Sequence, residues 1–381
     1  MSVSNIGNNE KLIGVPGSRY QLNTPALILD LDLLEQNILK MADNCHHRNI
    51  NLRPVAKIHK SIEIAKLQIK AGALGVCCAT LTEAEIMAKN SIPGILLFTS
   101  VVTTSKIDRL VEANKQTKNL MVAVDDFSNV EALGAAACKA GKQLDLLIDF
   151  EIGGNRTGLN DEEMVVNLAK TISRTNGLTY KGIQGYNGAT QRIPKFDKRK
   201  TAQKLSTKPL SNLIKRLTKE KLKPIIVTGG GTGTVDIDSE QGIFTESQAG
   251  SYVFMDVNYK DIPLNTTDPF PFKPSLYVQT TVVSNSKKGF VITDAGIKEF
   301  AREQFAPEIS YGAPMDATYE LVGDDLGRIN LPRGTQNLPL GSKVECIPPH
   351  CYATLNLYNV FHCVQGDKLV DIWSIDSRKN Y

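Results

Sequence analysis

From about residue 25 to about residue 231, the chain alternates between short apolar runs and longer amphipathic stretches, and this alternation is the feature that most constrains its fold. We interpret eight of the runs as strands: Pro25–Leu31, Asn51–Lys57, Gly75–Thr80, Ile95–Ser100, Asn119–Asp125, Leu144–Glu151, Tyr180–Tyr186 and Pro224–Thr228. Helical patterns lie between them, and two pairs resemble capping boxes at helix starts: Thr82 with Glu85, and Ser128 with Glu131. Strands buried on both faces that alternate with helices predict an α/β fold, a parallel (β/α)8 TIM-type barrel.

After about residue 262 the pattern changes. Four prolines (Pro263, Pro269, Pro271 and Pro274) come close together, and strand-like runs such as Tyr277–Ser284 and Gly289–Thr293 follow without long helical patterns. We therefore predict a C-terminal β-rich domain made of residues 263–381 together with residues 1–24, and a barrel domain of residues 25–262. A chain of 381 residues suits a barrel with one smaller domain.

Composition excludes several classes of partner. With 41% apolar and 22% charged residues the chain is expected to be globular. It contains no run of about 18 uncharged apolar residues, so we expect no membrane span. The N-terminus does not resemble a signal peptide, and the seven cysteines are odd in number with no C-x-x-C pair, so we expect free thiols in the cytoplasm. Most of the excess of positive over negative charge lies in Lys195–Lys223, where leucines at helical spacing favour a solvated helix face over a nucleic-acid site.

The second predicted strand ends in the segment R-P-V-A-K-I-H-K, in which Lys57 and His59 are two residues apart. A strand period of two would place both on one face, at the strand end where barrel enzymes hold their active sites. A partly desolvated lysine has its ammonium form disfavoured there and can attack an aldehyde. The alternative is that Lys57 and Lys60 are solvated residues at a helix start.

The eighth predicted strand runs into T-G-G-G-T-G-T, residues Thr228–Thr234. Consecutive glycines let backbone N–H groups approach an anion, and the loops after strands seven and eight are the usual phosphate site of a barrel. A glycine loop without a ligand is the alternative. Gln248–Tyr252 offers a second turn of small residues. A reactive lysine together with a phosphate site points to pyridoxal phosphate, whose aldehyde needs an amine and whose phosphate needs hydrogen-bond donors.

Further segments have a recognisable form: Thr24–Leu31, Leu52–Ser61, Gly75–Ala79, Glu83–Glu85, Gly153–Gly158, Thr228–Gly233, Glu246–Asp256 and Pro348–Cys351. Together they resemble the family of D-threonine aldolase, D-serine dehydratase and 3-hydroxy-D-aspartate aldolase, which are alanine-racemase-type (fold type III) pyridoxal phosphate enzymes. The R-P-x-x-K-x-H-K and G-G-G-T-G motifs, in that order and spacing, are specific. The similarity extends from about residue 20 to Tyr381.

This resemblance implies roles for individual residues. Lys57 would bind the cofactor covalently, and His59 would be the acid–base residue that acts on the β-hydroxyl of the substrate. The remaining cofactor contacts would be Gly230, Gly231, Thr232, Gly250 and Ser251 at the phosphate, with Gln184, Tyr186 and Gln191 elsewhere on the cofactor. Arg156 matches an arginine near the cofactor ring, and an ion pair with Glu151 or Asp149 is the open alternative.

The resemblance also concerns a metal. Metal-dependent members bind a divalent ion (Mn²⁺, Mg²⁺ or Zn²⁺) through a histidine and an Asp or Cys two residues later. His350 fills the first position, but Tyr352 occupies the second, and Leu326 replaces a histidine of the family pattern. A protonated phenol is a poor ligand for Mn²⁺ or Mg²⁺. A metal bound by His350 and a structural role for His350 both stay open.

The activity implied by the resemblance is that of a lyase, which cleaves the Cα–Cβ bond of D-β-hydroxy-α-amino acids to glycine and an aldehyde. Alternatives on the same platform are a dehydratase of D-serine or D-hydroxyaspartate, a metal-independent racemase or epimerase, and a non-catalytic cofactor-binding protein. The family also implies a homodimer in which the β domain of one subunit covers the barrel of another. Arg192, Lys195 and Arg328 are candidates to pair with a substrate β-carboxylate, or are surface charges.

Overall fold

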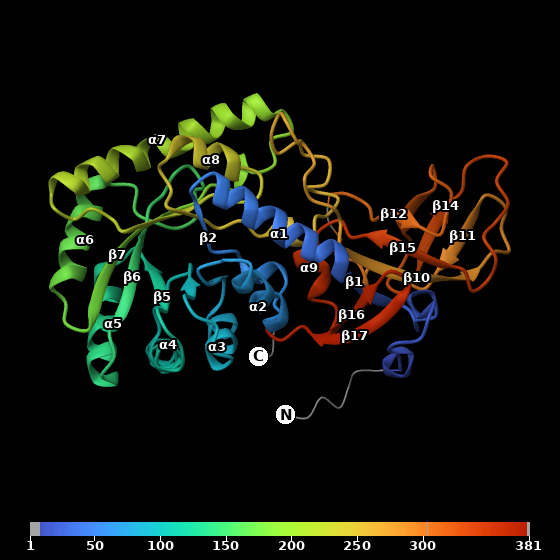
Figure 1. The fold of residues 1–381 in the computed structure, drawn as a ribbon, viewed down its shortest axis with the longest axis horizontal. Helices are drawn as coiled ribbons and strands as arrows, with labels where there is room; N and C mark the ends of the chain where they lie inside the picture. Colours follow the sequence, from blue (N-terminus) through green and yellow to red (C-terminus); the bar gives the residue numbers. More distant parts are fainter. Residues whose placement is uncertain (1–7, 303, 379–381) are drawn as a thin grey trace. The chain divides into compact units, whose positions relative to one another are not determined.

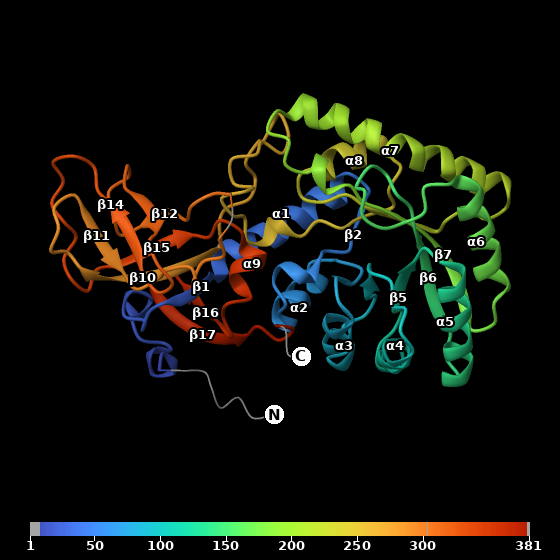
Figure 2. The ribbon, with the colours of Figure 1, turned by 180° about the vertical axis from the view of Figure 1, so that it is seen from behind.

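A computed structural model describes residues 8–302 and 304–378. Residues 1–7 of the predicted β-rich domain, and residues 379–381, lie outside the described part. The chain divides into two units, each of which we treat by itself (Figures 1 and 2). Unit 1 takes its residues from Met1–Ile38, Ser251–Asp261 and Pro271–Tyr381, and unit 2 consists of Leu39–Gly250 and Ile262–Phe270.

Unit 2 is built on a parallel sheet of eight strands. In chain order these are β2 (Asn51–Leu52), β3 (Cys77–Cys78), β4 (Leu96–Leu97), β5 (Met121–Val124), β6 (Leu144–Asp149), β7 (Leu178–Gly185), β8 (Ile226–Gly229) and β9 (Glu246–Ser247). In space they follow the order β2-β9-β8-β7-β6-β5-β4-β3, and a parallel bridge between Val55 and Cys77 joins the two ends. The sheet therefore curls into the predicted α/β barrel.

Helices cover the outer face of this sheet, and Figure 1 shows α3, α4, α5 and α6 side by side along it. The helices of unit 2 are α2 (Ile62–Lys70), α3 (Leu81–Lys89), α4 (Thr104–Gln116), α5 (Phe127–Ala140), α6 (Glu162–Arg174), α7 (Phe196–Lys219), α8 (Val235–Gln241) and the short 3-10 helices η3 (Ala56–Ile58) and η4 (Gly188–Thr190). Inside the sheet, Cys77, Leu96, Met121 and Leu147 form a buried cluster. Burial on both faces explains why β4 and β5 are apolar throughout.

Two predicted helix starts are displaced by two residues. The capping box of α3 is formed by Thr80 and Glu83, and not by Thr82 and Glu85, because the Thr80 side chain accepts the N–H of Glu83 and the Glu83 side chain accepts that of Thr80. Asp126 is the N-cap of α5, where its side chain accepts the N–H of Asn129, so the predicted box at Ser128 is also wrong. Thr80 and Asp126 have the extended backbone of an N-cap, which sequence spacing alone does not show.

The predicted first barrel strand belongs to the other unit. β1 (Ala26–Asp30) pairs antiparallel with β10 (Leu276–Ser284) and parallel with β16 (Val360–Gln365). All five residues of β1 are buried, so its apolar run could fit either sheet. The eighth barrel strand is β9, whose two residues are too few to form a recognisable run. The predicted domains, residues 25–262 and residues 1–24 with 263–381, therefore differ in their bounds from the two units.

Unit 1 contains a mostly antiparallel sheet of nine strands, which confirms a C-terminal β-rich domain. Besides β1, β10 and β16 it has β11 (Phe290–Thr293), β12 (Glu308–Tyr311), β13 (Thr318–Leu321), β14 (Gly327–Asn330), β15 (Lys343–Ile347) and β17 (Lys368–Ser374), and the helices η1 (Glu10–Leu12), η2 (Ser18–Tyr20), η5 (Ser251–Val253) and α9 (Cys351–Leu355). The helix α1 (Leu31–His47) begins in unit 1 and ends in unit 2. Across residues 8–302 and 304–378, no helix has the length and apolar character required to span a membrane.

Candidate active site

Lys57 lies in η3, directly after β2 at one end of the curled sheet. The predicted strand Asn51–Lys57 ends at Leu52, because Pro54 has no N–H to donate to a neighbouring strand and Ala56–Ile58 forms a single 3-10 turn. In such a turn, residues two apart point in different directions. The alternation from which we expected Lys57 and His59 to share a face is therefore wrong.

The Lys57 side chain is half-buried, and its Nζ lies 5.7 Å from the centroid of the Phe98 ring, which follows β4. Burial lowers the pKa of the Lys57 amine, and the nearby charge of Arg156 lowers it further. Glu83 acts in the opposite direction, and Lys60 again lowers the pKa. The neutral amine, which is the nucleophilic form, is therefore favoured relative to a lysine in water.

His59 is completely buried, and its Nδ1 accepts the backbone N–H of Ser61 at 3.1 Å. Burial lowers the pKa of His59 to about 3, although a hydrogen bond with Gln68 opposes this shift. The ring is therefore neutral at physiological pH. Because Nδ1 accepts a hydrogen bond, the proton of the neutral ring lies on Nε2, and this atom is a donor.

Arg156 stands in the loop after β6, and its guanidinium carbon lies 5.2 Å from the centroid of the Tyr186 ring. Glu151 does not hold the Arg156 side chain; its carboxylate accepts the backbone N–H of Arg156 at 3.2 Å and those of Gly153 and Gly154. The loop is thus closed by Glu151, which leaves the guanidinium to stack on Tyr186. Burial raises the pKa of Tyr186, which keeps its phenol protonated.

Gln184 lies inside the barrel, almost fully buried, and belongs to a polar network that spans three strands. Its Nε2 donates to Oδ1 of Asp149 at 3.0 Å, and its Oε1 accepts from Gln248 Nε2 at 3.3 Å, which also reaches Thr228 Oγ1 at 3.2 Å. Sequence reasoning missed Asp149 as an interior residue. The signal was available, since Asp149 shares the strand face of the core residue Leu147.

The glycine loop after β8 is packed where only glycines fit. Gly230 has φ +65°, and a Cβ there would lie 2.2 Å from Oδ2 of Asp238. A Cβ on Gly231 would lie 2.7 Å from Oε1 of Gln191, and one on Gly250 would lie 3.1 Å from Cβ of Val55.

Side chains brace this loop from behind. Gln191 Nε2 donates to Thr234 Oγ1 at 3.0 Å, and that hydroxyl donates to Oδ2 of Asp238 at 2.6 Å. Burial raises the pKa of Asp238 to about 7, against the hydrogen bonds from Thr234 and Gln203. The structure thus brings Gln191 beside Gly231 and Thr234, whereas the sequence groups Gln191 with Gln184 and Tyr186.

Arg199, which the sequence left among solvated charges, is fully buried beside this loop. Its Nε donates to the carbonyl of Gly233 at 2.8 Å, its Nη1 donates to that of Ile193 at 2.6 Å, and its Nη2 donates to that of Pro263. The guanidinium therefore fixes the loop by its backbone. Because the carbonyls of Gly233 and Pro263 are 34 and 64 positions away in the sequence, local spacing does not reveal this role.

The residues of unit 2 fit pyridoxal phosphate. A phosphate held by backbone N–H groups needs a loop whose backbone is not covered by side chains. A Cβ would collide with neighbouring atoms at the predicted phosphate contacts Gly230 and Gly231, as it would at Gly229 and Gly233 of the same loop. An aldehyde needs a neutral amine, and the lowered pKa of Lys57 supplies one.

Three predicted residues belong to unit 1: Ser251, His350 and Tyr352. Ser251 begins η5, and its carbonyl accepts the N–H of Met255 at 2.9 Å. His350 precedes α9, with its ring centroid 5.9 Å from that of Tyr352. Within the described ranges, no three His, Cys, Asp or Glu side chains gather as a metal site would require. An imidazole beside a phenol does not fit a resident Mn²⁺ or Mg²⁺.

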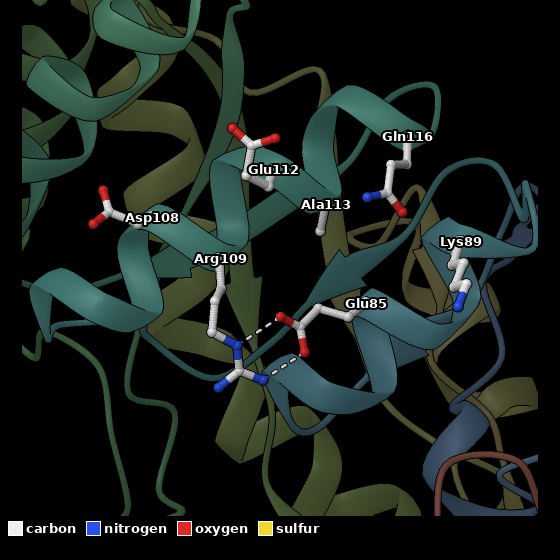
Figure 3. A pocket seen from close by; sticks show the side chains of 7 residues that line it. All are labelled: Glu85, Lys89, Asp108, Arg109, Glu112, Ala113 and Gln116. Carbon is white, nitrogen blue, oxygen red and sulfur yellow. Dashed lines mark hydrogen bonds and ion pairs between the residues drawn. The ribbon is translucent and has the colours of Figure 1, made fainter.

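A shallow pocket on the outside of the barrel holds none of these candidates (Figure 3). It lies between α3 and α4 and is lined by Glu85, Lys89, Asp108, Arg109, Glu112, Ala113 and Gln116. Arg109 Nε donates to Oε1 of Glu85 at 2.7 Å across it. Glu85 thus joins two surface helices, whereas Glu83, two residues earlier, is buried.

Comparison with known proteins gives consistent matches over nearly the whole chain. Residues 29–257 match the family described as Alanine racemase, N-terminal domain, and residues 275–364 match a serine dehydratase domain. The chain is 35% identical to a 3-hydroxy-D-aspartate aldolase of Paracoccus denitrificans (strain Pd 1222), over 96% of this chain and 94% of that protein. It is 33% identical to a D-threonine aldolase of an Arthrobacter species, over 94% and 93%. The crystal structure of D-threonine aldolase from Filomicrobium marinum superposes with a TM-score of 0.86 at 33% identity, over 94% and 96%.

Proposed function

Because the chain belongs to the alanine racemase N-terminal domain family, joined to a serine dehydratase domain, we propose that it is a pyridoxal phosphate-dependent lyase. The proposed reaction cleaves the Cα–Cβ bond of D-β-hydroxy-α-amino acids to give glycine and an aldehyde. Two aldolases, each at least 33% identical over more than nine-tenths of the chain, support this reaction over a dehydration. The proposal depends above all on one arrangement: a half-buried Lys57, with its Nζ 5.7 Å from the Phe98 ring, in a barrel that also carries the tightly packed glycine loop after β8.

The residues of unit 2 divide the proposed work among themselves. Lys57 would bind the cofactor aldehyde, and the backbone of Gly230, Gly231 and Thr232 would hold the phosphate. When bound, pyridoxal phosphate withdraws electrons from Cα of the amino acid. Arg156, stacked on Tyr186, places a positive charge beside Lys57 that helps to keep its amine neutral.

Five further residues stay predicted cofactor contacts: Gly250, Ser251, Gln184, Tyr186 and Gln191. Gln184 is held by Asp149 and Gln248, and this fixes its orientation in the barrel interior.

His59 is the proposed acid–base residue at the substrate hydroxyl. In the described state its ring carries the proton on Nε2, so it is prepared to donate a proton or a hydrogen bond. Acceptance of a proton at Nδ1 would require loss of the Ser61 contact. His59→Gln keeps a donor and removes proton exchange, so an active variant would limit His59 to hydrogen bonding.

We assign no step to a metal, because His350 and Tyr352 do not form a suitable donor set. The Tyr352 phenol would have to lose its proton to bind Mn²⁺ or Mg²⁺.

The test of the proposal is a product analysis. Purified protein is incubated with D-threonine and with 3-hydroxy-D-aspartate, with and without EDTA. Glycine together with acetaldehyde (from D-threonine) or glyoxylate (from 3-hydroxy-D-aspartate) supports the lyase. The product 2-oxobutanoate or oxaloacetate identifies a dehydratase, and an epimerised amino acid identifies a racemase. Borohydride reduction followed by peptide mass spectrometry must place a pyridoxyl group on Lys57. A pyridoxyl group on another lysine would refute the assignment.

The protein is also proposed to be a cytoplasmic homodimer. All seven cysteines are free thiols, which agrees with a reducing compartment. Unit 1 exposes large apolar side chains, among them Met315 at 99%, Leu340 at 62% and Tyr311 at 49%. Exposed apolar side chains indicate a contact with another chain where they form a contiguous patch. Light scattering that gives only the monomer mass at micromolar concentration would exclude the dimer.

A further inference from the structure

We infer that Lys60 and Glu83 form a buried charge pair whose function is to set the reactivity of the Lys57 amine. Both are positioning residues, since neither is assigned a contact with substrate or cofactor. The inference rests on the proposed function only in taking Lys57 as the nucleophile. The pair itself is a feature of the folded chain.

The backbone at Lys60 is unusual. Lys60 has φ +54°, a left-handed conformation that lysine rarely adopts, and its N–H donates to the carbonyl of Ala56 at 2.7 Å. This turn closes η3 and directs the chain from Lys57 to α2. It also buries Lys60, whose exposed fraction is 2%. A strained backbone that buries a charged side chain persists only where surrounding contacts hold it.

Glu83 is the contact that holds the Lys60 side chain. Its Oε1 lies 3.3 Å from Nζ of Lys60, and both side chains are almost fully buried. Its other oxygen, Oε2, accepts the backbone N–H of Ala79 at 2.7 Å and that of Thr80 at 3.3 Å. The carboxylate is therefore fixed at the start of α3. Its charge has a constant position relative to the barrel.

Both charges of the pair act on Lys57. Burial and three charged groups influence the pKa of that amine: burial and Arg156 lower it, Glu83 raises it, and Lys60 lowers it. Glu83 alone would stabilise the ammonium form of Lys57 and so reduce its reactivity. Lys60 acts against this effect, and its contact with Glu83 keeps the two opposite charges together. The pair therefore weakens the stabilisation that the carboxylate alone would give to the ammonium form.

The neighbouring Glu85 provides a matched control. It lies on the same helix, but it faces the outer pocket, where it pairs with Arg109 (Figure 3). Removal of its charge leaves the buried pair intact. The three substitutions Lys60→Met, Glu83→Gln and Glu85→Gln therefore separate the field at Lys57 from general effects of charge on α3.

The experiment measures the Lys57 amine directly. Full-length protein, freed of cofactor with hydroxylamine, is labelled with trace acetic anhydride across a pH series. The acetylated peptide that contains Lys57 is then quantified by mass spectrometry. The resulting curve gives the pKa of this one amine without any turnover. A separate borohydride reduction of the cofactor-loaded protein tests whether Lys57 is the attachment site, so failure of the proposed function is seen independently.

We expect the two single substitutions to act in opposite directions. Lys60→Met leaves Glu83 unopposed, raises the pKa of Lys57 and slows acetylation at pH 7 by about threefold or more. Glu83→Gln leaves Lys60 unopposed, lowers the pKa of Lys57 and speeds acetylation by a similar factor. In the double variant the pair carries no charge, so its acetylation rate should lie between those of the two single variants. The acetylation rate of Glu85→Gln should match that of the parent protein.

The inference would be overturned if the pKa of Lys57 shifted in the same direction in both variants, or shifted in neither. A purely structural role of the pair does not predict opposite shifts for the loss of a positive and of a negative charge. If Lys60→Met does not fold, the comparison of Glu83→Gln with the double variant decides the question. Addition of Lys60→Met to Glu83→Gln removes a positive charge, so it must slow acetylation again. An unchanged rate in that comparison would also refute the role of Lys60.

Discussion

Gly230→Ala tests how the loop after β8 is built. Gly230 has φ +65°, and a methyl group there would lie 2.2 Å from Oδ2 of Asp238. The carboxyl cannot move freely, because Oδ2 accepts from Thr234 at 2.6 Å and Oδ1 accepts from Gln203 at 2.7 Å. The substitution therefore forces either the loop or these buried hydrogen bonds to give way.

The expected cost has two parts. The left-handed backbone costs an alanine about 1–2 kcal/mol, and disruption of a buried hydrogen bond costs about 1–3 kcal/mol more. Gly230→Ala should therefore lower the free energy of unfolding by about 2–5 kcal/mol. Because the loop is the proposed phosphate site, we also expect affinity for pyridoxal phosphate to fall by about tenfold or more, which corresponds to about 1.4 kcal/mol.

Gly242→Ala is the matched control. Gly242 has φ +62°, almost the same backbone conformation, but an added methyl group would meet open space, with no atom from elsewhere in the described chain within 4 Å. It should show the backbone cost of about 1–2 kcal/mol and no loss of cofactor affinity. Urea unfolding followed by circular dichroism gives the first quantity, and absorbance titration of cofactor-free protein gives the second. If the two variants are equally stable and bind cofactor equally well, contact with Asp238 does not shape the loop.

Three further predictions concern charge and metal. Burial lowers the pKa of His59 to about 3, so between that pH and about 6.5 the unfolded chain binds a proton that the folded chain does not. The free energy of unfolding should therefore fall as the pH drops below about 6.5, by up to about 3 kcal/mol at pH 4. His59→Phe should flatten this pH dependence, as measured by urea unfolding. Arg199→Met removes the donor from the carbonyls of Ile193, Gly233 and Pro263 and should cost about 2–4 kcal/mol, with weaker cofactor binding in the same titration. Unchanged cofactor binding would show that Arg199 does not act on the loop. EDTA should leave the activity unchanged. Tyr352→Asp adds a carboxylate near His350 and should increase the Mn²⁺ content of the protein, measured by mass spectrometry. A stoichiometric metal in the parent protein would contradict both expectations.

The alternation of strands and helices was sufficient to predict the barrel, but not to assign every strand to a sheet. β1 is as apolar as a barrel strand because it is buried between β10 and β16. β9 has only two residues, and its place is decided by hydrogen bonds to β2 and β8. The local sequence pattern indicates that a segment is buried, but it does not indicate which strands the segment pairs with.

The site divides in the same way. Lys57 and Gly230 could be found because the R-P-x-x-K-x-H-K and G-G-G-T-G motifs keep their chemistry within a few residues. The contact between Arg199 and Gly233 spans 34 positions and ends on a backbone carbonyl, so no spacing rule reveals it. The Lys60–Glu83 pair joins two segments whose meeting depends on barrel closure at Val55 and Cys77. Such contacts become visible only in the folded chain.

The pairing of β1 has a consequence for the order in which the protein can form during synthesis. Residues 26–30 must wait for residues 276–284 and 360–365 before they have neighbours on either side. Unit 2, in contrast, is almost contiguous from Leu39 to Gly250 and can close while the ribosome is still making the rest. The emerging amino-terminal strand is then an unpaired apolar edge for more than two hundred residues of translation, and it is the segment that a chaperone would most need to shield.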